Sequence, residues 1–383
     1  MKTIFLYKKI YLKKIKMSGK IFSQFENIYI EEKFKNNINV EKILSRVTGK
    51  SKISYVDDIT KLMKILPQSH PNEVSKNLLL SGIRGDVLRK CPGTNGHICC
   101  NYYVINLYVG CPLGCTYCIL QSYLNQPLTI INLDIDSIFL SLDKIFKENN
   151  KKFFRVGTGE LGDSLVYDHL TDYSTEFIDF FAGYKNTIFE FKTKTTNVSN
   201  LLQKQSPGNV VVGFSVNPSI VSEKEETYAS KIEDRISCAK ELVSKGYKIA
   251  LHFDPLINIE NFENEYSILI DNIFKNLSPK NIAWISLGTF RYTPDLKICI
   301  EYNYPKTKIL CEEFIVDRDK KFRYFKTIRI ELYKKIIDKL KSINDNLTIY
   351  LCMESKEVWK KTLGFLPFDE SKVDLIFKNA VNL

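Results

Sequence analysis

Short apolar runs alternate with longer amphipathic stretches along most of this chain. From Tyr103 onward, runs rich in β-branched and aromatic residues are each followed by a stretch whose apolar positions recur with helical spacing. Continuous apolar strands that alternate with helices are typical of a parallel sheet buried on both faces. Six such units predict an α/β fold with a partial (βα)6 TIM-type barrel, more naturally than a doubly wound sheet. The predicted strands are Val104–Val109, Phe153–Gly157, Thr187–Phe191, Val210–Ser215, Lys248–Phe253 and Ile282–Leu287. The predicted helices are Ser137–Glu148, Ser174–Tyr184, Asn197–Gln203, Lys231–Ser244 and Glu263–Asn276.

Chemically useful residues follow each predicted strand. The active sites of parallel barrels form at the C-terminal ends of the strands, because the loops converge there. We therefore expect the six stretches to meet in one site. In chain order they are Cys111, Gly157-Thr158-Gly159-Glu160, Lys192-Thr193-Lys194, Ser215-Val216-Asn217, His252-Phe253-Asp254 and Gly288-Thr289-Phe290-Arg291.

The chain divides into three predicted segments. Residues 1–100 form a mixed, partly irregular N-terminal extension, residues 101–300 form the barrel, and residues 301–383 form a C-terminal hairpin, helix and closing segment. The extension contains two predicted helices, Asn39–Thr48 and Asp57–Ile65. The last segment contains a predicted hairpin with its polar turn at Asp317–Lys321, a helix Ile328–Ile343, a strand Thr348–Cys352 and a closing stretch around Trp359.

Composition places the chain among ordinary globular proteins. It has 383 residues, of which 44% are hydrophobic and 26% charged, enough for one large α/β domain or two smaller ones. No apolar run approaches the ~20 residues that span a bilayer. Lysines interrupt the apolar residues of Met1–Ile10, so we expect neither a secretory signal nor a membrane segment. Ten cysteines in such a chain do not suggest a disulfide framework, and we expect a cytoplasmic protein.

The net charge of +11 is concentrated near the N-terminus. Residues 1–50 carry twelve Lys or Arg and four Asp or Glu, which gives +8. A basic tail of this kind can bind nucleic acid phosphates. It can equally be a solvated, lysine-rich extension, and charge alone does not decide between the two.

Three cysteines form one short loop, Cys111-Pro112-Leu113-Gly114-Cys115-Thr116-Tyr117-Cys118. Three thiolates can hold three irons of a four-iron cubane and leave the fourth iron open to a small molecule. The other interpretations are three buried free cysteines or a zinc loop, although zinc usually takes four ligands with C-x2-C pairs. The C-x3-C-x2-C spacing resembles the cluster loop of radical S-adenosylmethionine (SAM) enzymes. That resemblance implies a [4Fe-4S] cluster and SAM, which is cleaved to a 5′-deoxyadenosyl radical.

A larger set of motifs resembles the spore photoproduct lyase family of radical SAM enzymes, over roughly residues 90–355. The resemblance implies a radical SAM barrel and a lyase that repairs a thymine dimer joined through a methyl group in DNA. It also implies two partners, DNA and a low-potential electron donor of the flavodoxin or ferredoxin type. The motifs are Cys115-Thr116-Tyr117-Cys118-Ile119-Leu120-Gln121, Phe214-Ser215-Val216-Asn217, Gly246-Tyr247-Lys248-Ile249, Asp254-Pro255, Tyr304-Pro305-Lys306-Thr307-Lys308 and Phe322-Arg323-Tyr324.

The resemblance also implies roles for individual residues. Tyr117 would lie against SAM, with Lys194 on its carboxylate and Ser215 on its polar edge. The cluster would be held by Cys111, Cys115 and Cys118. At the lesion pocket, arginines would hold phosphate or carbonyl groups, and a ring would stack or wedge beside the bases. These positions are Arg291, Arg323 and Tyr324, and the hairpin that carries the last two would hold the DNA strand open.

The chain departs from the well-characterised lyases at two positions. They have a hydrogen-donating cysteine where this chain has Glu160, and a tyrosine where it has Ile119. The stretch Gly157-Thr158-Gly159-Glu160 resembles instead the Gly-Gly-Glu element of other radical SAM enzymes. Its glycines would let the backbone approach SAM, and Glu160 would take the amino group. The departures favour an alternative, a radical SAM enzyme on RNA or a metabolite. A third hypothesis is a nucleic-acid-binding protein with a structural cluster and no turnover.

Several further residues have open interpretations. The group Cys91, His97, Cys99 and Cys100 is a second metal site, a source of a hydrogen-donating thiol, or a set of unreactive buried thiols. Cys352 could also face the site. His252 could be an acid or base, a substrate contact, or a residue that only hydrogen-bonds in the barrel. Asp163 could be a helix cap or a contact to the ribose of SAM. The pair Glu225-Glu226 is expected on the solvated surface.

Overall fold

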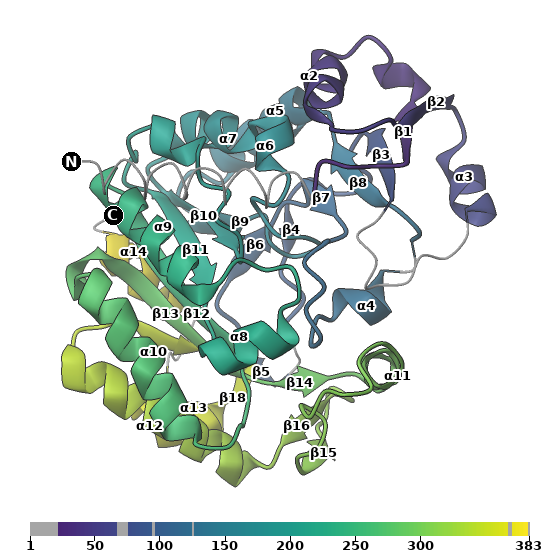
Figure 1. Ribbon diagram of the computed structural model, residues 1–383. Helices are drawn as coiled ribbons and strands as arrows, with labels where there is room; N and C mark the ends of the chain where they lie inside the picture. Colours follow the sequence, from purple (N-terminus) through teal and green to yellow (C-terminus); the bar gives the residue numbers. More distant parts are fainter. Residues whose placement is uncertain (1–21, 67–75, 94–95, 125, 367–369, 382–383) are drawn as a thin grey trace, which may run out of the picture.

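The structure is a computed structural model that describes residues 22–66, 76–93, 96–124, 126–366 and 370–381 (Figure 1). The first 21 residues of the predicted basic tail, and the Met1–Ile10 stretch within it, lie outside the described residues. No helix in the described ranges is long and apolar enough to cross a membrane.

A curled eight-stranded sheet forms the centre of the fold (Figure 1). Seven strands run parallel and the edge strand β4 runs antiparallel to β6. All residues of β11 and β13 are buried, as expected for strands covered on both faces. The sheet order is β17 (Ile349–Leu351), β13 (Ile282–Thr289), β12 (Lys248–Leu256), β11 (Val210–Ser215), β10 (Thr187–Thr193), β9 (Phe154–Gly157), β6 (Tyr102–Val104) and β4 (Arg89–Lys90).

Helices connect these strands, and the predicted helix positions are largely confirmed. One prediction is wrong: between β10 and β11 there is only the short 3-10 helix η2 (Leu201–Gln203), not a helix over Asn197–Gln203. The others are α5 (Ile135–Glu148), α6 (Asp168–Thr171), α7 (Tyr173–Ala182), α8 (Ser219–Glu225), α9 (Ile232–Ser244), α10 (Phe262–Asn276), η3 (Pro279–Asn281) and α12 (Lys326–Ile343).

The predicted first strand, Val104–Val109, is also wrong as a single element. β6 ends at Val104 in the central sheet, and β7 (Tyr108–Val109) belongs to a different sheet. The residues between them remain buried, because the chain passes directly from one sheet into the other. Because the apolar run is continuous, nothing in the sequence signalled the break between β6 and β7.

A second sheet, which we did not predict, occupies the N-terminal part of the chain (Figure 1). Its order is β2 (Lys52–Val56), β1 (Asn27–Glu31), β3 (Asn77–Ser81), β8 (Thr129–Asn132) and β7, with β7 antiparallel to β8 and the others parallel. The two predicted helices of this region are confirmed as α2 (Ile38–Arg46) and α3 (Ile59–Ile65), and η1 (Glu32–Phe34) follows β1. Strands from both sides of residue 100 share this sheet. The domain boundary proposed at residue 100 stays a prediction.

The C-terminal segment forms the predicted hairpin and a closing layer. β15 (Phe314–Val316) and β16 (Phe322–Tyr324) pair through the turn at Asp317–Lys321, and β14 (Arg291–Tyr292) joins β16. β17 extends the central sheet beside β13, as the predicted strand Thr348–Cys352 required. The remaining elements are α4 (Leu120–Tyr123), α11 (Pro294–Asn303), β18 (Glu354–Ser355) paired with β5 (His97–Ile98), α13 (Lys356–Leu363) and α14 (Glu370–Val381).

Candidate active site

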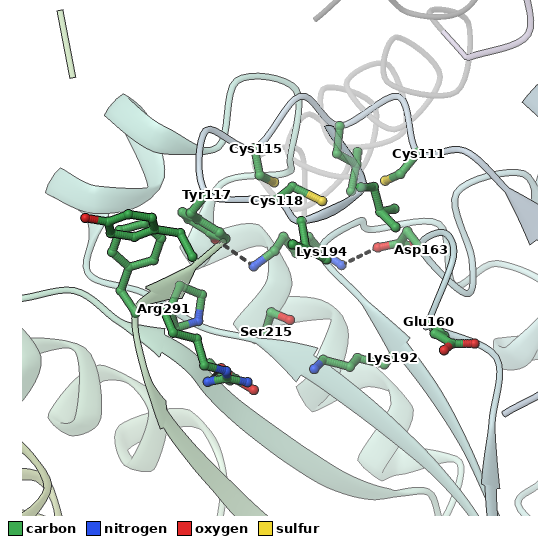
Figure 2. Close-up of a pocket in the computed structure, with 18 of the residues that line it drawn as sticks. Cys111, Cys115, Tyr117, Cys118, Glu160, Asp163, Lys192, Lys194, Ser215 and Arg291 are labelled. Atoms are coloured by element: carbon green, nitrogen blue, oxygen red, sulfur yellow. Dashed lines mark hydrogen bonds and ion pairs between the residues drawn. The ribbon is translucent and has the colours of Figure 1, made fainter. Parts of the chain in front are cut away.

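A cavity of about 320 Å³ lies at the C-terminal edge of the central sheet (Figure 2). Five neighbouring strands contribute residues to it, so the predicted convergence of the strand ends is confirmed for β9 to β13. The three cysteines of the loop line the same cavity. The predicted site residues that line it are Cys111, Cys115, Tyr117, Cys118, Gly159, Glu160, Lys194, Ser215 and Arg291.

The cysteine loop is held by its surroundings rather than by its own regular structure. The amide of Thr116 donates to the carbonyl of Glu225 at 2.9 Å, and the hydroxyl of Tyr304 donates to the carbonyl of Gly114 at 3.0 Å. Cys115 also forms an antiparallel bridge with Glu226. Gly114 has a φ of +59°, a conformation that favours glycine. These contacts fix the loop against the segment that follows α8.

The three thiols have the donor chemistry that an iron–sulfur cluster requires. Burial raises the pKa of Cys111, Cys115 and Cys118, and Lys194 opposes this effect at the last two. A bound metal would favour the thiolate forms. Among the described residues, no three His, Cys, Asp or Glu side chains are already gathered at metal-binding spacing. The thiols therefore share one wall of the cavity without forming a closed metal site.

Lys194 lines the cavity, and its ammonium is already bonded to two side chains of the protein. Its ammonium lies 3.1 Å from Glu226 Oε1 and donates to the hydroxyl of Tyr117 at 2.9 Å. Tyr117 and Arg235 also donate to Glu226. Although burial opposes ionisation, Lys194 and Arg235 lower the pKa of Glu226 well below its usual range. The expectation that Glu225 and Glu226 are solvated is wrong, because both are buried.

Glu160 faces the cavity from the loop after β9. Its carboxylate accepts from the side-chain amide of Asn106 at 2.9 Å and lies 3.4 Å from Arg89. Gly159 lines the cavity beside it, whereas Gly157 and Thr158 do not. Gly157 packs against Tyr102, whose hydroxyl would lie 1.7 Å from a Cβ added at this position. The glycine is thus required by the neighbouring ring of Tyr102.

Asp163 lines the cavity but binds the backbone of β10. It accepts from the amide of Lys194 at 2.7 Å and from the hydroxyl of Thr193 at 2.8 Å. It also accepts from the amide of Leu165 at 3.0 Å, although the next helix begins only at Asp168. Asp163 is therefore not a helix cap. It positions the end of the strand that carries Lys194.

The expected lesion-contact residues lie in different surroundings. Arg291 lines the cavity and donates to Asp254 at 3.3 Å. Arg323 is buried in the hairpin strand β16, where it forms ion pairs with Asp317 and Asp319 of the turn at 3.2 and 2.6 Å. Tyr324 is also buried, and its hydroxyl accepts from the amide of Asn258 at 3.1 Å. Only Arg291 of the three lines the cavity; Lys192, Lys321 and Met353 line it too, and we had not assigned them to the substrate.

His252 and the additional cysteines complete the site's surroundings. His252 lies inside the sheet, 2.7 Å from Glu190, and burial lowers its pKa. It does not line the cavity, so the interpretation as an internal hydrogen-bonding residue is favoured. Cys352 lies beside the cavity, with its sulfur 3.8 Å from a guanidinium nitrogen of Arg291. Burial raises the pKa of Cys91 most, and the nearby thiols of Cys100 and Cys99 raise it further.

Comparison with known proteins decides the family. The sequence model described as spore photoproduct lyase matches residues 27–355. The chain belongs to the spore photoproduct lyase family. The spore photoproduct lyase of Clostridium acetobutylicum is 26% identical over 312 residues, which cover 80% of this chain and 83% of that protein. The Geobacillus sp. lyase is 28% identical over 214 residues, 55% of this chain. That match spans 63% of the Geobacillus protein, which is less than two thirds of its length.

Solved structures of family members share this fold. Spore photoproduct lyase complexed with dinucleoside spore photoproduct aligns with a TM-score of 0.74 at 21% identity, over 85% of this chain and 98% of that one. A double mutant with bound AdoMet and dinucleoside spore photoproduct aligns with the same TM-score and identity, over 87% and 99%. At this identity the likeness establishes the fold, and the ligands in those structures belong to those proteins.

Proposed function

We propose that this chain is a radical SAM enzyme that cleaves thymine-dimer-type lesions in DNA. The observation that carries the proposal is the arrangement of one cavity. Three thiols form one of its walls, and polar side chains that follow five neighbouring strands form the others. Family membership supports a photoproduct lyase and supplies the substrate class.

The cysteines would hold a [4Fe-4S] cluster, with its fourth iron open to the amino acid end of SAM. When bound, these two cofactors supply a 5′-deoxyadenosyl radical. The residues of the chain would bind SAM and orient it. Glu160 would accept a hydrogen bond from the amino group of SAM, and Ser215 would contact the polar edge of SAM. Lys194 uses two N–H bonds on Glu226 and Tyr117, which leaves the third for the SAM carboxylate.

A radical SAM enzyme on RNA or a metabolite is the second candidate. The observation that favours it is Glu160, a carboxylate that cannot readily donate a hydrogen atom, at the position of the family's cysteine. A repair reaction in this chain would need another hydrogen donor. Cys352 lies beside the cavity, and burial raises its pKa, which keeps its S–H bond intact at neutral pH.

Anaerobic reconstitution with iron, sulfide, a strong reductant and SAM tests the proposal directly. The substrate is a dinucleotide spore photoproduct, and mass spectrometry follows 5′-deoxyadenosine and thymidylyl-thymidine. Loss of the dimer with formation of thymidylyl-thymidine would support repair. The same assay on Cys352→Ala then asks whether Cys352 donates the hydrogen atom.

The other outcomes separate the alternatives. Formation of 5′-deoxyadenosine without repair would overturn the lesion substrate and keep the radical enzyme. No 5′-deoxyadenosine under strong reduction would leave a nucleic-acid-binding protein with a structural cluster. The Cys118→Ala variant is the matched control, because it removes one proposed iron ligand and keeps the cavity.

A further inference from the structure

Four cationic side chains line the cavity, and one of them forms no side-chain hydrogen bond or ion pair with the described residues. Lys194, Arg291 and Lys321 each form an ion pair with a carboxylate, at N–O distances of 3.1, 3.3 and 3.8 Å. Lys192 is the fourth. Within the described part of the chain, its ammonium makes no hydrogen bond and no ion pair. Because no carboxylate of the described residues lies within ion-pair distance of this half-buried ammonium, it can bind a ligand that carries a negative charge.

The position of Lys192 is set by its backbone. Its amide donates to the hydroxyl of Ser164 at 2.9 Å, and its carbonyl accepts from the amide of Ser164 at 3.1 Å. Gly159 packs on the base of the side chain, where an added Cβ would lie 3.1 Å from Lys192 Cβ. The strand and the loop after β9 therefore direct this ammonium into the cavity.

Lys192 serves the side of the cavity away from the cysteine loop. Figure 2 shows it extending toward Arg291, with Lys194 closer to the cysteines. The electrostatic effects agree with this placement. Against the effect of burial, Arg291 and then Lys192 lower the pKa of Asp254 to about 2. Lys194, in contrast, donates to the hydroxyl of Tyr117 at 2.9 Å, and Tyr117 lies within the cysteine loop.

We propose that Lys192 binds the phosphodiester of the lesion-bearing strand, and so makes the cavity select nucleotide over nucleoside substrates. The SAM carboxylate belongs to the cysteine side, where Lys194 lies. On the opposite side, Asp254 is already paired with Arg291, so Lys192 is left for a group that brings its own negative charge. In a strand that carries a thymine dimer, the bases are neutral and the phosphodiester is anionic. Lysine binds phosphate as a point charge. This inference rests on the proposed function.

The test compares two substrates that differ only in that charge. Dinucleotide spore photoproduct carries the bridging phosphodiester, and dinucleoside spore photoproduct lacks it. For the reconstituted enzyme, we expect Lys192→Met to raise KM for the dinucleotide by about tenfold or more, as for loss of a charge-assisted contact. KM for the dinucleoside should change less than twofold, as a rough bound set by the same reasoning. Lys192→Arg should recover most of the dinucleotide affinity.

Two controls keep the comparison specific. Lys339→Met removes a lysine that pairs with Asp271 on the outer helices at 2.6 Å, so it changes the net charge equally without touching the cavity. The SAM dissociation constant of Lys192→Met should equal that of the unchanged protein. An equal rise in KM for both substrates, no change for either, or a loss of SAM affinity would each overturn the proposal.

A labelling experiment separates this inference from the proposed activity. Reductive methylation of the reconstituted protein, followed by peptide mass spectrometry, should modify Lys192. Thymidylyl-thymidine should protect it, whereas two unlinked thymidines at equal concentration should not. Protection without any lesion cleavage would keep the phosphate contact and overturn the repair activity. Lesion cleavage without protection of Lys192 would keep the repair activity and overturn the phosphate contact.

Discussion

At the residue scale, Glu226 is the side chain on which the contacts beneath the cysteine loop converge. It accepts from Tyr117, Lys194, Asn217 and Arg235, and its backbone bridges Cys115. Two of these donors are residues that we place on SAM. A buried carboxylate with two cationic partners holds both of them in one arrangement. The position of Glu226 therefore connects the stability of the loop to the shape of the cofactor site.

The substitution Glu226→Gln should lower both stability and SAM affinity. The glutamine side chain would keep the volume and leave Lys194 and Arg235 as two uncompensated buried cations, which costs about 3 kcal/mol of unfolding free energy. Urea denaturation measures the loss. Glu225→Gln is the matched control, because Glu225 is also buried but its side chain accepts only from Thr307 in the hydrogen bonds described. Equal losses in the two variants would contradict a special role of Glu226.

The residue scale also shows where sequence reasoning succeeds and where it fails. Cysteines at fixed spacing on one loop must lie close together, so the thiol wall was predictable. Glu226 was not, because an acidic pair followed by a polar stretch has the same pattern as a solvated surface. Its cationic partners lie 32 residues before it and 9 residues after it, and only the tertiary fold brings them together.

At the element scale, ion pairs between Arg323 and the turn hold the hairpin. Arg323 binds both acidic residues of the turn, Asp317 and Asp319, and the carbonyl of Met353 at 3.3 Å. If its role is to shape the hairpin, then Asp319→Ala and Arg323→Met should impair dinucleotide repair to a similar degree. A direct lesion contact by Arg323 would instead leave Asp319→Ala nearly as active as the unchanged protein. Values of kcat/KM for the three proteins decide between these outcomes.

A second element-scale prediction concerns His169, which joins three segments. Its ring forms hydrogen bonds with the side chains of Ser23 at 2.9 Å and Asn197 at 3.0 Å. Burial lowers its pKa from 6.5 to about 4. The folded state therefore favours the neutral ring, whereas the unfolded chain gains a proton below about pH 6.5. The contribution of His169 to the free energy of unfolding should be fully present above pH 6.5, and this free energy should fall by about 3 kcal/mol as the pH drops to 4.

Urea denaturation between pH 7 and pH 4 measures this dependence. His169→Gln should be less stable at pH 7 and should show a flatter profile over the same window, because glutamine does not titrate. A variant profile as steep as that of the unchanged protein would assign the pH dependence to other groups.

At the scale of the whole molecule, the C-terminal helix α14 closes the central sheet. Phe377 packs edge-on against Trp284 and Tyr350, and its ring lies 4.0 Å from the guanidinium of the buried Arg155. Phe377→Ala should lower the unfolding free energy by about 4 kcal/mol, through the cavity and the lost cation–π contact. Leu375→Ala on the same helix is the matched control, since Leu375 is 52% exposed and should cost less than about 1 kcal/mol. Thermal unfolding of both variants measures the difference.

The sequence by itself determined the features that depend on local pattern. Strand and helix periodicity, the thiol spacing and the polar strand ends predicted an α/β fold with a parallel sheet, the hairpin and the edge where the cavity lies, whereas the exact (βα)6 barrel stays a prediction. The tertiary structure decided what depends on pairing between distant segments. It divided Val104–Val109 between two sheets, built the N-terminal sheet from β1, β2, β3, β7 and β8, and buried Arg323 and Tyr324 in the hairpin strand β16. It also engaged Lys194 with Glu226 and left Lys192 unpaired within the described ranges. The physical reason is that a side chain's type limits which partners it accepts, whereas the fold decides which of those partners lies within reach.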